Sequence, residues 1–161
     1  MPPAPPVTVG AFLATLKTNM AARFAASGTL NDVKTYIVAP PAEEEPMSNL
    51  LVLVRDRMLE RDDLANATRT RKRDQTVTIP GAVKAYGTSK TGGDSAFQIA
   101  MDRAAAILDE LIYELRDNVP QVGQQTRSGL VTAVSWMPYA VEKGGWIVRG
   151  DYTLTYSTRV S

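Results

Sequence analysis

Residues 93–118 constrain the fold most, because they have the pattern of one long amphipathic helix. Their apolar residues recur at alternating steps of four and three, which places them on one helical face. That face consists of Phe97, Met101, Ala104, Leu108, Leu111 and Leu115, widened by Ile99, Ala100, Ile107 and Ile112. Asp94 is placed to cap the helix start, and Pro120 follows its end. A single helix cannot bury such a stripe alone, so we expect it to pack on the strands that precede and follow it.

The other periodic segments predict one more helix and four strands. Residues 8–27 repeat apolar residues at helical spacing. Strands are expected at 33–39, at 130–139, at 146–160, and at 50–54, where a continuous apolar run suits a strand covered on both faces. Consecutive pairs of strands between helices predict an α+β fold. We therefore expect a mainly antiparallel sheet of about four strands packed by two helices.

Alternation of apolar and polar residues predicts which side chains of the last two strands share a face. In the final strand the apolar face is expected to hold Trp146, Val148, Tyr152, Leu154, Tyr156 and Val160. In the strand before it, one side is expected to hold Leu130, Val134 and Trp136, and the other Val131, Ala133 and Met137. Both tryptophans are interpreted as core or interface aromatics.

The length of 161 residues suits a single domain, expected at 8–161. A proline-rich extended arm at 1–7 precedes it. Residues 57–91 predict a charged, flexible excursion between the second strand and the long helix. It is expected to be irregular or partly helical at first and extended from 71 to 86, and Pro80-Gly81 is expected to interrupt any strand ladder there.

The residue types present exclude several kinds of chemistry. The sequence has no cysteine and no histidine, which rules out disulfides, thiolate nucleophiles, thiolate or imidazole zinc sites and Ser-His-Asp catalysis. The glycine-rich loop at 87–93 is not a P-loop, because Gly93 and Asp94 stand where Lys and Ser or Thr are needed. The adjacent carboxylates Asp109-Glu110 and Asp62-Asp63 lack a third ligand at a defined spacing. No catalytic residue, metal site or cofactor is predicted.

Two charged stretches are the candidate interaction residues. The basic cluster consists of Arg69, Arg71, Lys72 and Arg73, and the acidic one of Glu43, Glu44 and Glu45. No aromatic residue is interleaved with the basic cluster, so base stacking is not indicated, although contact with phosphates is open to it. A solvated or subunit-interface loop is the more common outcome for such a cluster, so contact with a neighbouring subunit is favoured over contact with nucleic acid.

The overall composition argues against two further partners. A formal net charge of +1 creates no general attraction for nucleic acid or anionic membranes. The apolar runs are too short for a membrane span. The first residues lack the pattern of a signal peptide, so we expect a protein made and kept in the cytoplasm.

The order of these elements resembles the tail terminator (tail completion) proteins of long-tailed bacteriophages. The resemblance rests on the first helix and the apolar strand pair after it, on the alanine-rich helix at 96–108, and on the closing strands at 129–136 and 145–156. It covers residues 8–160. That family has no catalytic residues to carry over to this chain.

The resemblance implies a structural role in a virion. Such proteins form a six-membered ring that caps the head-proximal end of the tail tube and joins it to the connector proteins of the head. The implied partners are other copies of the chain, the tail tube protein, a head-completion or connector protein, and DNA passing non-specifically through the lumen, with no cofactor and no membrane. The protein would be assembled in the host cytoplasm. The alternatives are another neck or head-completion protein, a small carboxylate-based enzyme, or a monomeric nucleic-acid-binding module.

Overall fold

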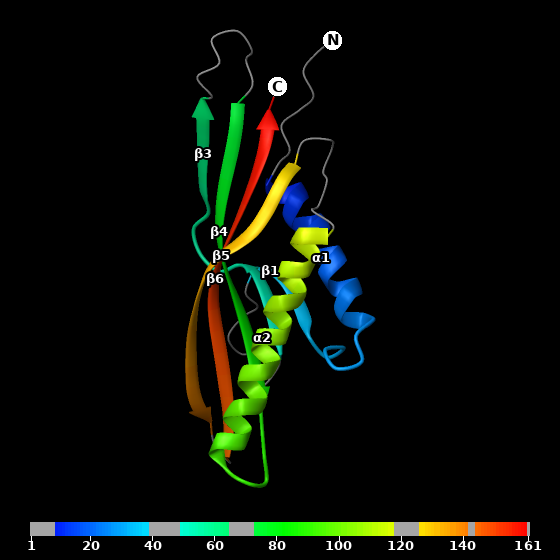
Figure 1. Cartoon of the computed structure of the whole chain (residues 1–161), viewed down its shortest axis with the longest axis vertical. Helices are drawn as coiled ribbons and strands as arrows, with labels where there is room; N and C mark the ends of the chain where they lie inside the picture. Colours follow the sequence, from blue (N-terminus) through cyan, green and yellow to red (C-terminus); the bar gives the residue numbers. More distant parts are fainter. Residues whose placement is uncertain (1–8, 39–48, 65–72, 118–125, 142–143, 161) are drawn as a thin grey trace.

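A computed structural model describes residues 9–38, 49–64, 73–117, 126–141 and 144–160. Within these ranges, two helices lie against one six-stranded sheet (Figure 1). The elements are α1 (Val9–Ala25), β1 (Lys34–Val38), β2 (Leu50–Val54), β3 (Leu59–Leu64), β4 (Arg73–Gly87), α2 (Gly93–Asp117), β5 (Thr126–Val141) and β6 (Gly145–Val160). The α+β class, the two helices and the mainly antiparallel sheet are confirmed.

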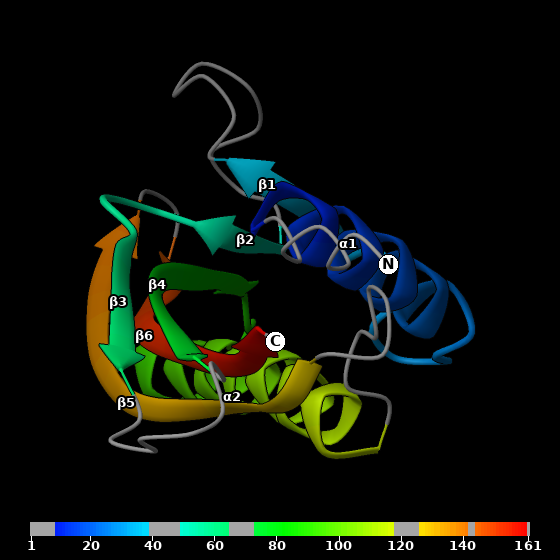
Figure 2. The same cartoon turned by 90° about the horizontal axis from the view of Figure 1, so that it is seen from above.

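The sheet is organised around the pair β4 and β6. The strand order is β1-β2-β4-β6-β5, with β3 also paired to β4, and only β1 and β2 run parallel. The β4–β6 ladder runs from Arg73 opposite Val160 to Gly87 opposite Trp146. The strands twist strongly along this length, as the views from the side and from above show (Figures 1 and 2).

The excursion differs most from the prediction. Its first part, expected to be irregular or partly helical, contains the strand β3 at 59–64. Its later part, expected to be extended from 71 to 86, forms β4 at 73–87, as predicted. These two strands add to the expected four. Pro80 does not interrupt the ladder to β6, where it lies opposite Thr153. On its other side, β4 pairs with β3 only as far as Thr78 and with β2 only from Ala82. The missing N–H of Pro80 therefore falls in a gap between two partner strands, where no ladder bond is lost.

The helix α2 begins and ends within one residue of the predicted bounds, and Asp94 lies in its first turn. Its buried apolar residues are Ala96, Ala100, Ala104, Ile107, Leu108, Leu111 and Leu115. Ile99 and Ile112 are exposed, which contradicts their predicted place on the buried face. Alanines on successive turns let the helix approach the sheet closely: a Cβ at Gly87 would lie 2.4 Å from the Ala96 carbonyl oxygen. Because Ile99 and Ile112 are exposed, the face of α2 that contacts the sheet is narrower than predicted.

The core lies between the inner face of the sheet and both helices. The buried residues of α1 are Phe12, Leu13, Leu16, Met20 and Phe24. The Phe12 ring stacks on that of Tyr156 in β6, with ring centroids 4.0 Å apart. Val148, Tyr152, Leu154 and Tyr156 are buried and the polar residues between them are half-exposed, so the predicted alternation of β6 is confirmed for these side chains.

A buried tyrosine joins β6 to β2 across β4. The Tyr152 side chain passes over Gly81, where a Cβ would lie 2.2 Å from its ring. Its hydroxyl donates a hydrogen bond to the Val52 carbonyl oxygen at 2.8 Å. A larger residue at position 81 would displace the ring, so glycine is required by this close approach.

A second buried polar residue, Asn49, fixes the start of β2. Its side-chain oxygen accepts a hydrogen bond from the Tyr86 N–H at 2.9 Å, and its side-chain nitrogen donates to Asp32 at 2.8 Å. Its carbonyl accepts the Lys34 N–H at 3.1 Å. Burial of this amide is therefore compensated on both sides, and the ends of β1, β2 and β4 are held together.

The strand β5 is longer than predicted and contains a bulge. A register shift between Val131 and Ala133 interrupts the alternation. Val131 and Val134 therefore both face the helices, opposite Leu154 and Tyr152, whereas Leu130 faces the other way. The predicted grouping of Leu130 with Val134 and Trp136 is wrong for this reason. No helix within the described ranges is long and apolar enough to cross a membrane.

Two adjacent residues of α2 test the packing. Leu111 is fully buried and Ile112 is 38% exposed. Leu111→Ala is expected to lower the free energy of unfolding by about 2–5 kcal/mol through lost transfer energy and a cavity. The matched variant Ile112→Ala is expected to change it by about 0.5 kcal/mol or less. Urea denaturation of both variants measures the difference, and equal losses would contradict the assigned face.

The Tyr152 hydroxyl gives a test that depends on pH. Burial raises the pKa of Tyr152 above its ordinary value, so the phenol contributes stability that is complete below about pH 10 and is lost as the unfolded chain ionises above it. Tyr152→Phe is expected to cost about 0.5–1.5 kcal/mol at pH 7, and this deficit should shrink above about pH 10. Urea denaturation at pH 7 and at values above about pH 10 measures it. The exposed Tyr139→Phe is the control, and a deficit independent of pH would refute the argument.

Candidate assembly interface

The residues predicted to form the interface lie mainly outside the described ranges. This holds for Arg69, Arg71 and Lys72, and for the acidic stretch Glu43, Glu44 and Glu45. Arg73 is the first residue of β4, where it pairs with Leu64 of β3 and with Val160 of β6. The structure therefore places only the backbone of Arg73, and the roles of both clusters stay predictions.

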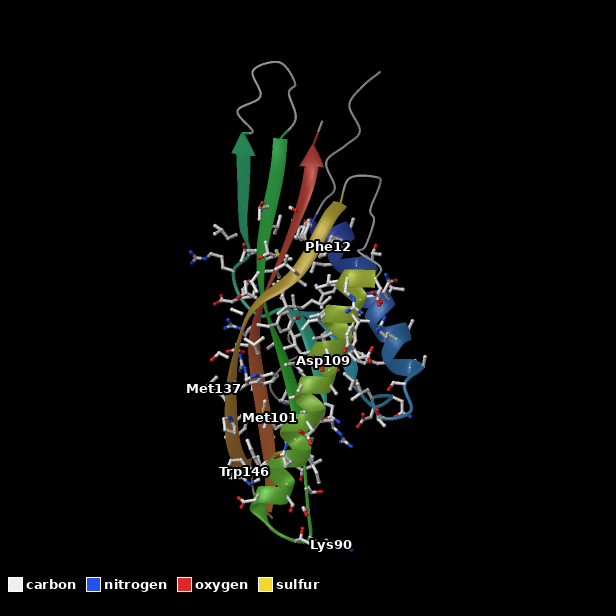
Figure 3. All side chains as sticks on the ribbon, viewed as in Figure 1. Phe12, Lys90, Met101, Asp109, Met137 and Trp146 are labelled. Atoms are coloured by element: carbon white, nitrogen blue, oxygen red, sulfur yellow. The ribbon has the colours of Figure 1, made fainter. Side chains whose placement is uncertain are left out.

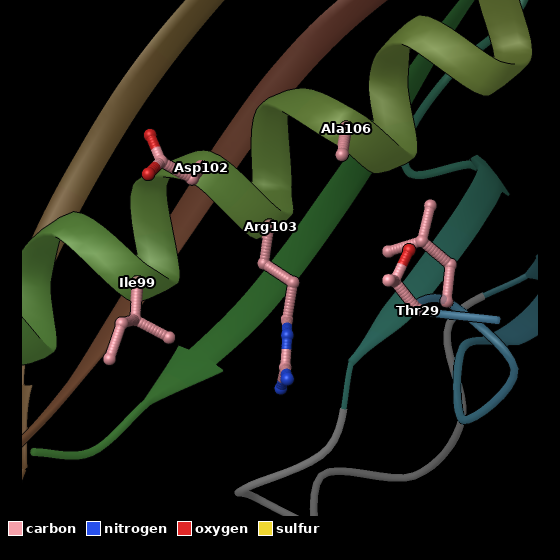
Figure 4. Close-up of a pocket in the computed structure, with 6 residues that line it drawn as sticks. Thr29, Ile99, Asp102, Arg103 and Ala106 are labelled. Carbon is pink, nitrogen blue, oxygen red and sulfur yellow. The ribbon is translucent and has the colours of Figure 1, made fainter.

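Two features of the described residues bear on chemistry: the spacing of possible metal ligands and a groove beside α2. No group of three or more acidic, histidine or cysteine side chains among them could hold a metal ion. An open groove of about 310 Å³ lies between α2 and the segment after α1 (Figure 4). It is lined by Thr29, Leu30, Ile99, Asp102, Arg103 and Ala106. Asp102 and Arg103 point in different directions there, and the Asp102 carboxylate accepts a hydrogen bond from Gln98 at 2.7 Å.

The charged groups between the helices have a structural role. Arg23 of α1 donates from Nε to Glu110 and from Nη1 to Glu114 of α2, the latter at 3.0 Å. The hydrogen bond to Glu110 is the main cause that raises the pKa of Arg23. Glu114 is only 4% exposed, so its carboxylate needs this partner. The network joins the two helices and offers no free acid or base.

The face of the sheet away from the helices carries a group of charged side chains. Arg55 and Arg149 share the carboxylate of Asp151, at 3.5 Å and 3.0 Å. Lys84 lies opposite Arg149 in the ladder, and partial burial, followed by the Arg149 charge, lowers the pKa of Lys84. Two arginines on this face therefore share one carboxylate, and Lys84 lies beside them in the ladder.

The longest exposed apolar stretch of the described chain lies along β5. Its exposed large apolar residues are Leu130, Val134, Met137 and Tyr139. The strand is also an edge of the sheet, since β6 is its only partner within the described ranges. Met137 lies on the side of β5 away from α2 (Figure 3). An edge strand with free backbone groups and exposed apolar side chains is the surface most suited to pairing with another chain.

A second exposed edge was missed from the sequence. Met58 and Leu59 are exposed where β3 begins, and β3 pairs only with β4 among the described elements. The sequence of β3, LERDDL, has neither alternation nor a β-branched residue. The one feature of the sequence that could have indicated β3 is its position shortly before the segment expected to be extended. Two such segments joined by a short connection can form a hairpin.

Comparison with known proteins gives a likeness of fold. No family model and no curated protein sequence matches the chain. By contrast, 26 chains of solved structures match it. One of them belongs to the "Virion of native gene transfer agent (GTA) particle" and is 18% identical, with a TM-score of 0.54 over 96% of this chain and 99% of that chain. The two proteins therefore share a fold that extends over nearly the whole of both chains.

Proposed function

We propose that this chain is a structural virion protein that forms a ring on the end of a phage-type tail tube, in the manner of a tail terminator. The observation that carries the proposal is the fold shared with a chain of the gene transfer agent virion over almost its full length. The order of elements that resembles tail terminators lies within the same span. In this role the ring stops growth of the tube and joins it to the head.

The described surface supports assembly over catalysis. The charges between α1 and α2 are paired with each other, and the groove beside α2 brings together no nucleophile and base. Four exposed large apolar residues instead lie along the edge strand β5. A protein that works by contact needs such surfaces, and they are costly to leave exposed in a monomer.

The partners follow from this role. They are other copies of the chain, the tail tube protein and a head-completion or connector protein, and DNA passes through the lumen of the ring. The protein would reside in the neck or tail of the virion. Another neck or head-completion protein is the alternative, and it differs in failing to bind the end of a tail tube.

Electron microscopy of the purified protein, alone and mixed with tail tubes, tests the proposal. Rings and tubes capped at one end are the expected result. Met137→Asp, which places a charge on the exposed face of β5, is expected to reduce ring formation strongly. Thr88→Asp, an exposed loop position with the same charge change, is the control. Rings that leave tubes uncapped would favour the alternative neck protein, and a monomer in all conditions would refute the proposal.

The basic cluster gives a separate test. Replacing Arg69, Arg71, Lys72 and Arg73 with serine is expected to impair ring assembly or tube joining, because we propose that these residues meet carboxylates of a neighbouring subunit or the tube. Ring formation, capped tubes and DNA delivery by complete particles are measured separately. Lys17→Ser/Lys90→Ser removes exposed charges elsewhere and is the control. Intact particles that fail only in DNA delivery would instead assign the cluster to the lumen.

A further inference from the structure

The half of the sheet that contains β3 has two open edges of compatible direction. Its strands lie in the order β3-β4-β6-β5, and every neighbouring pair is antiparallel. The edge strands β3 and β5 therefore run in opposite directions. Rotation about an axis roughly along the strands keeps each strand's direction, so β3 of one copy beside β5 of another would continue the antiparallel alternation.

The two edges also match in level and in exposed side chains. The registers place Leu59, Thr78, Thr155 and Leu130 in one row across the four strands. Leu59 and Leu130 end this row, on the face away from the helices, and they are 64% and 50% exposed. Between them lie only two half-exposed threonines. The exposure of an apolar residue at each end of a row of threonines is explained if Leu59 of one copy contacts Leu130 of another.

The amino-acid sequences of the edges carry opposite formal charge. LERDDL, the sequence of β3, has three acidic residues and one arginine. The first six residues of β5, TRSGLV, have one arginine and no acidic residue. Edges of opposite charge attract one another and disfavour pairing of like edges.

We propose that β3 of one copy adds to β5 of the next copy as an antiparallel neighbour, with Leu59 meeting Leu130. The contact is head-to-tail, so each copy gives one edge and receives the other, and repetition closes a ring. This inference rests on the proposed ring, and it names the surfaces that build it. The hydrogen-bonding groups of both edges are satisfied in the same step.

The other exposed edge, β1, is a poorer partner for β5. Val38 at its end is exposed, and β1 also runs antiparallel to β5. However, α1 lies beside β1, whereas β3 stands clear of both helices (Figures 1 and 2). Among the described elements, an approaching strand therefore meets no helix at β3 and meets α1 near β1.

The absence of cysteine from the sequence makes cross-linking a direct test. In the double variant Leu59→Cys/Leu130→Cys, facing residues of antiparallel strands would lie about 4.5–5.5 Å apart between Cα atoms, within the range of a disulfide. Oxidation is expected to convert most of the protein into covalent multimers larger than dimers. A short bis-maleimide also detects a register displaced by one step, in which the two residues would be diagonal neighbours about 7–8 Å apart.

Single variants and a second pair are the controls. Leu59→Cys and Leu130→Cys alone are expected to remain monomeric on denaturing gels. Val38→Cys/Ala133→Cys tests the competing pairing of β1 with β5 at its corresponding level. Both replaced residues of each pair are exposed, so the variants keep the core intact.

Microscopy of the same samples separates this inference from the proposed function. Rings that give no multimers with Leu59→Cys/Leu130→Cys, or that give them with Val38→Cys/Ala133→Cys, would overturn the β3–β5 contact and leave the ring intact as a function. A covalent dimer of Leu130→Cys alone would show that two β5 edges pair with each other, which also overturns it. Absence of both rings and multimers would overturn the two proposals together.

Discussion

The ladder between β4 and β6 is the interaction on which the rest of the structure depends. It is the longest antiparallel pairing of the described chain, and each of its two strands holds further elements in place. β4 receives β2 and β3, and β6 receives β5. The helix α2 packs over both through its alanine-rich face, and α1 reaches β6 through the stacked rings of Phe12 and Tyr156. Loss of this ladder would remove the surface that α2 covers and the contact of α1 with β6.

The sequence predicted those elements whose periodicity is set by burial. The helices, β2 and the alternating strand β6 each bury one side or both, so their apolar residues recur at the period of their backbone. β3 was missed because it is an edge strand with charged residues, and nothing in its composition separates it from a loop. The bulge after Val131 and the exposure of Ile112 were missed because each depends on the partner surface, which a single strand or helix pattern does not contain.

The candidate interface was only partly accessible from the sequence. The charge clusters at 43–45 and 69–73 are evident from the sequence. The residues that they contact belong to other chains, so the sequence cannot identify them. The exposed edge of β5 could be identified only from the strand order. Leu130 and Met137 are apolar, so the sequence alone does not distinguish them from buried residues. Only the sheet registers place Leu59 and Leu130 in one row, since they are separated in the sequence by one strand and a helix.

The gap beside Pro80 has a mechanical consequence. β2 and β3 are neighbours of the same strand, but they share no ladder, and the Arg55 N–H bonded to the Pro80 carbonyl at 2.7 Å is the contact that bridges the space between them. Cooperative opening spreads through contiguous hydrogen-bonded units and stops where they end. Opening of β3 therefore breaks its six pairs with β4 and none of the pairs between β2 and β4. The outer strand β3 can therefore separate from β4 while β2, β4 and β6 stay paired.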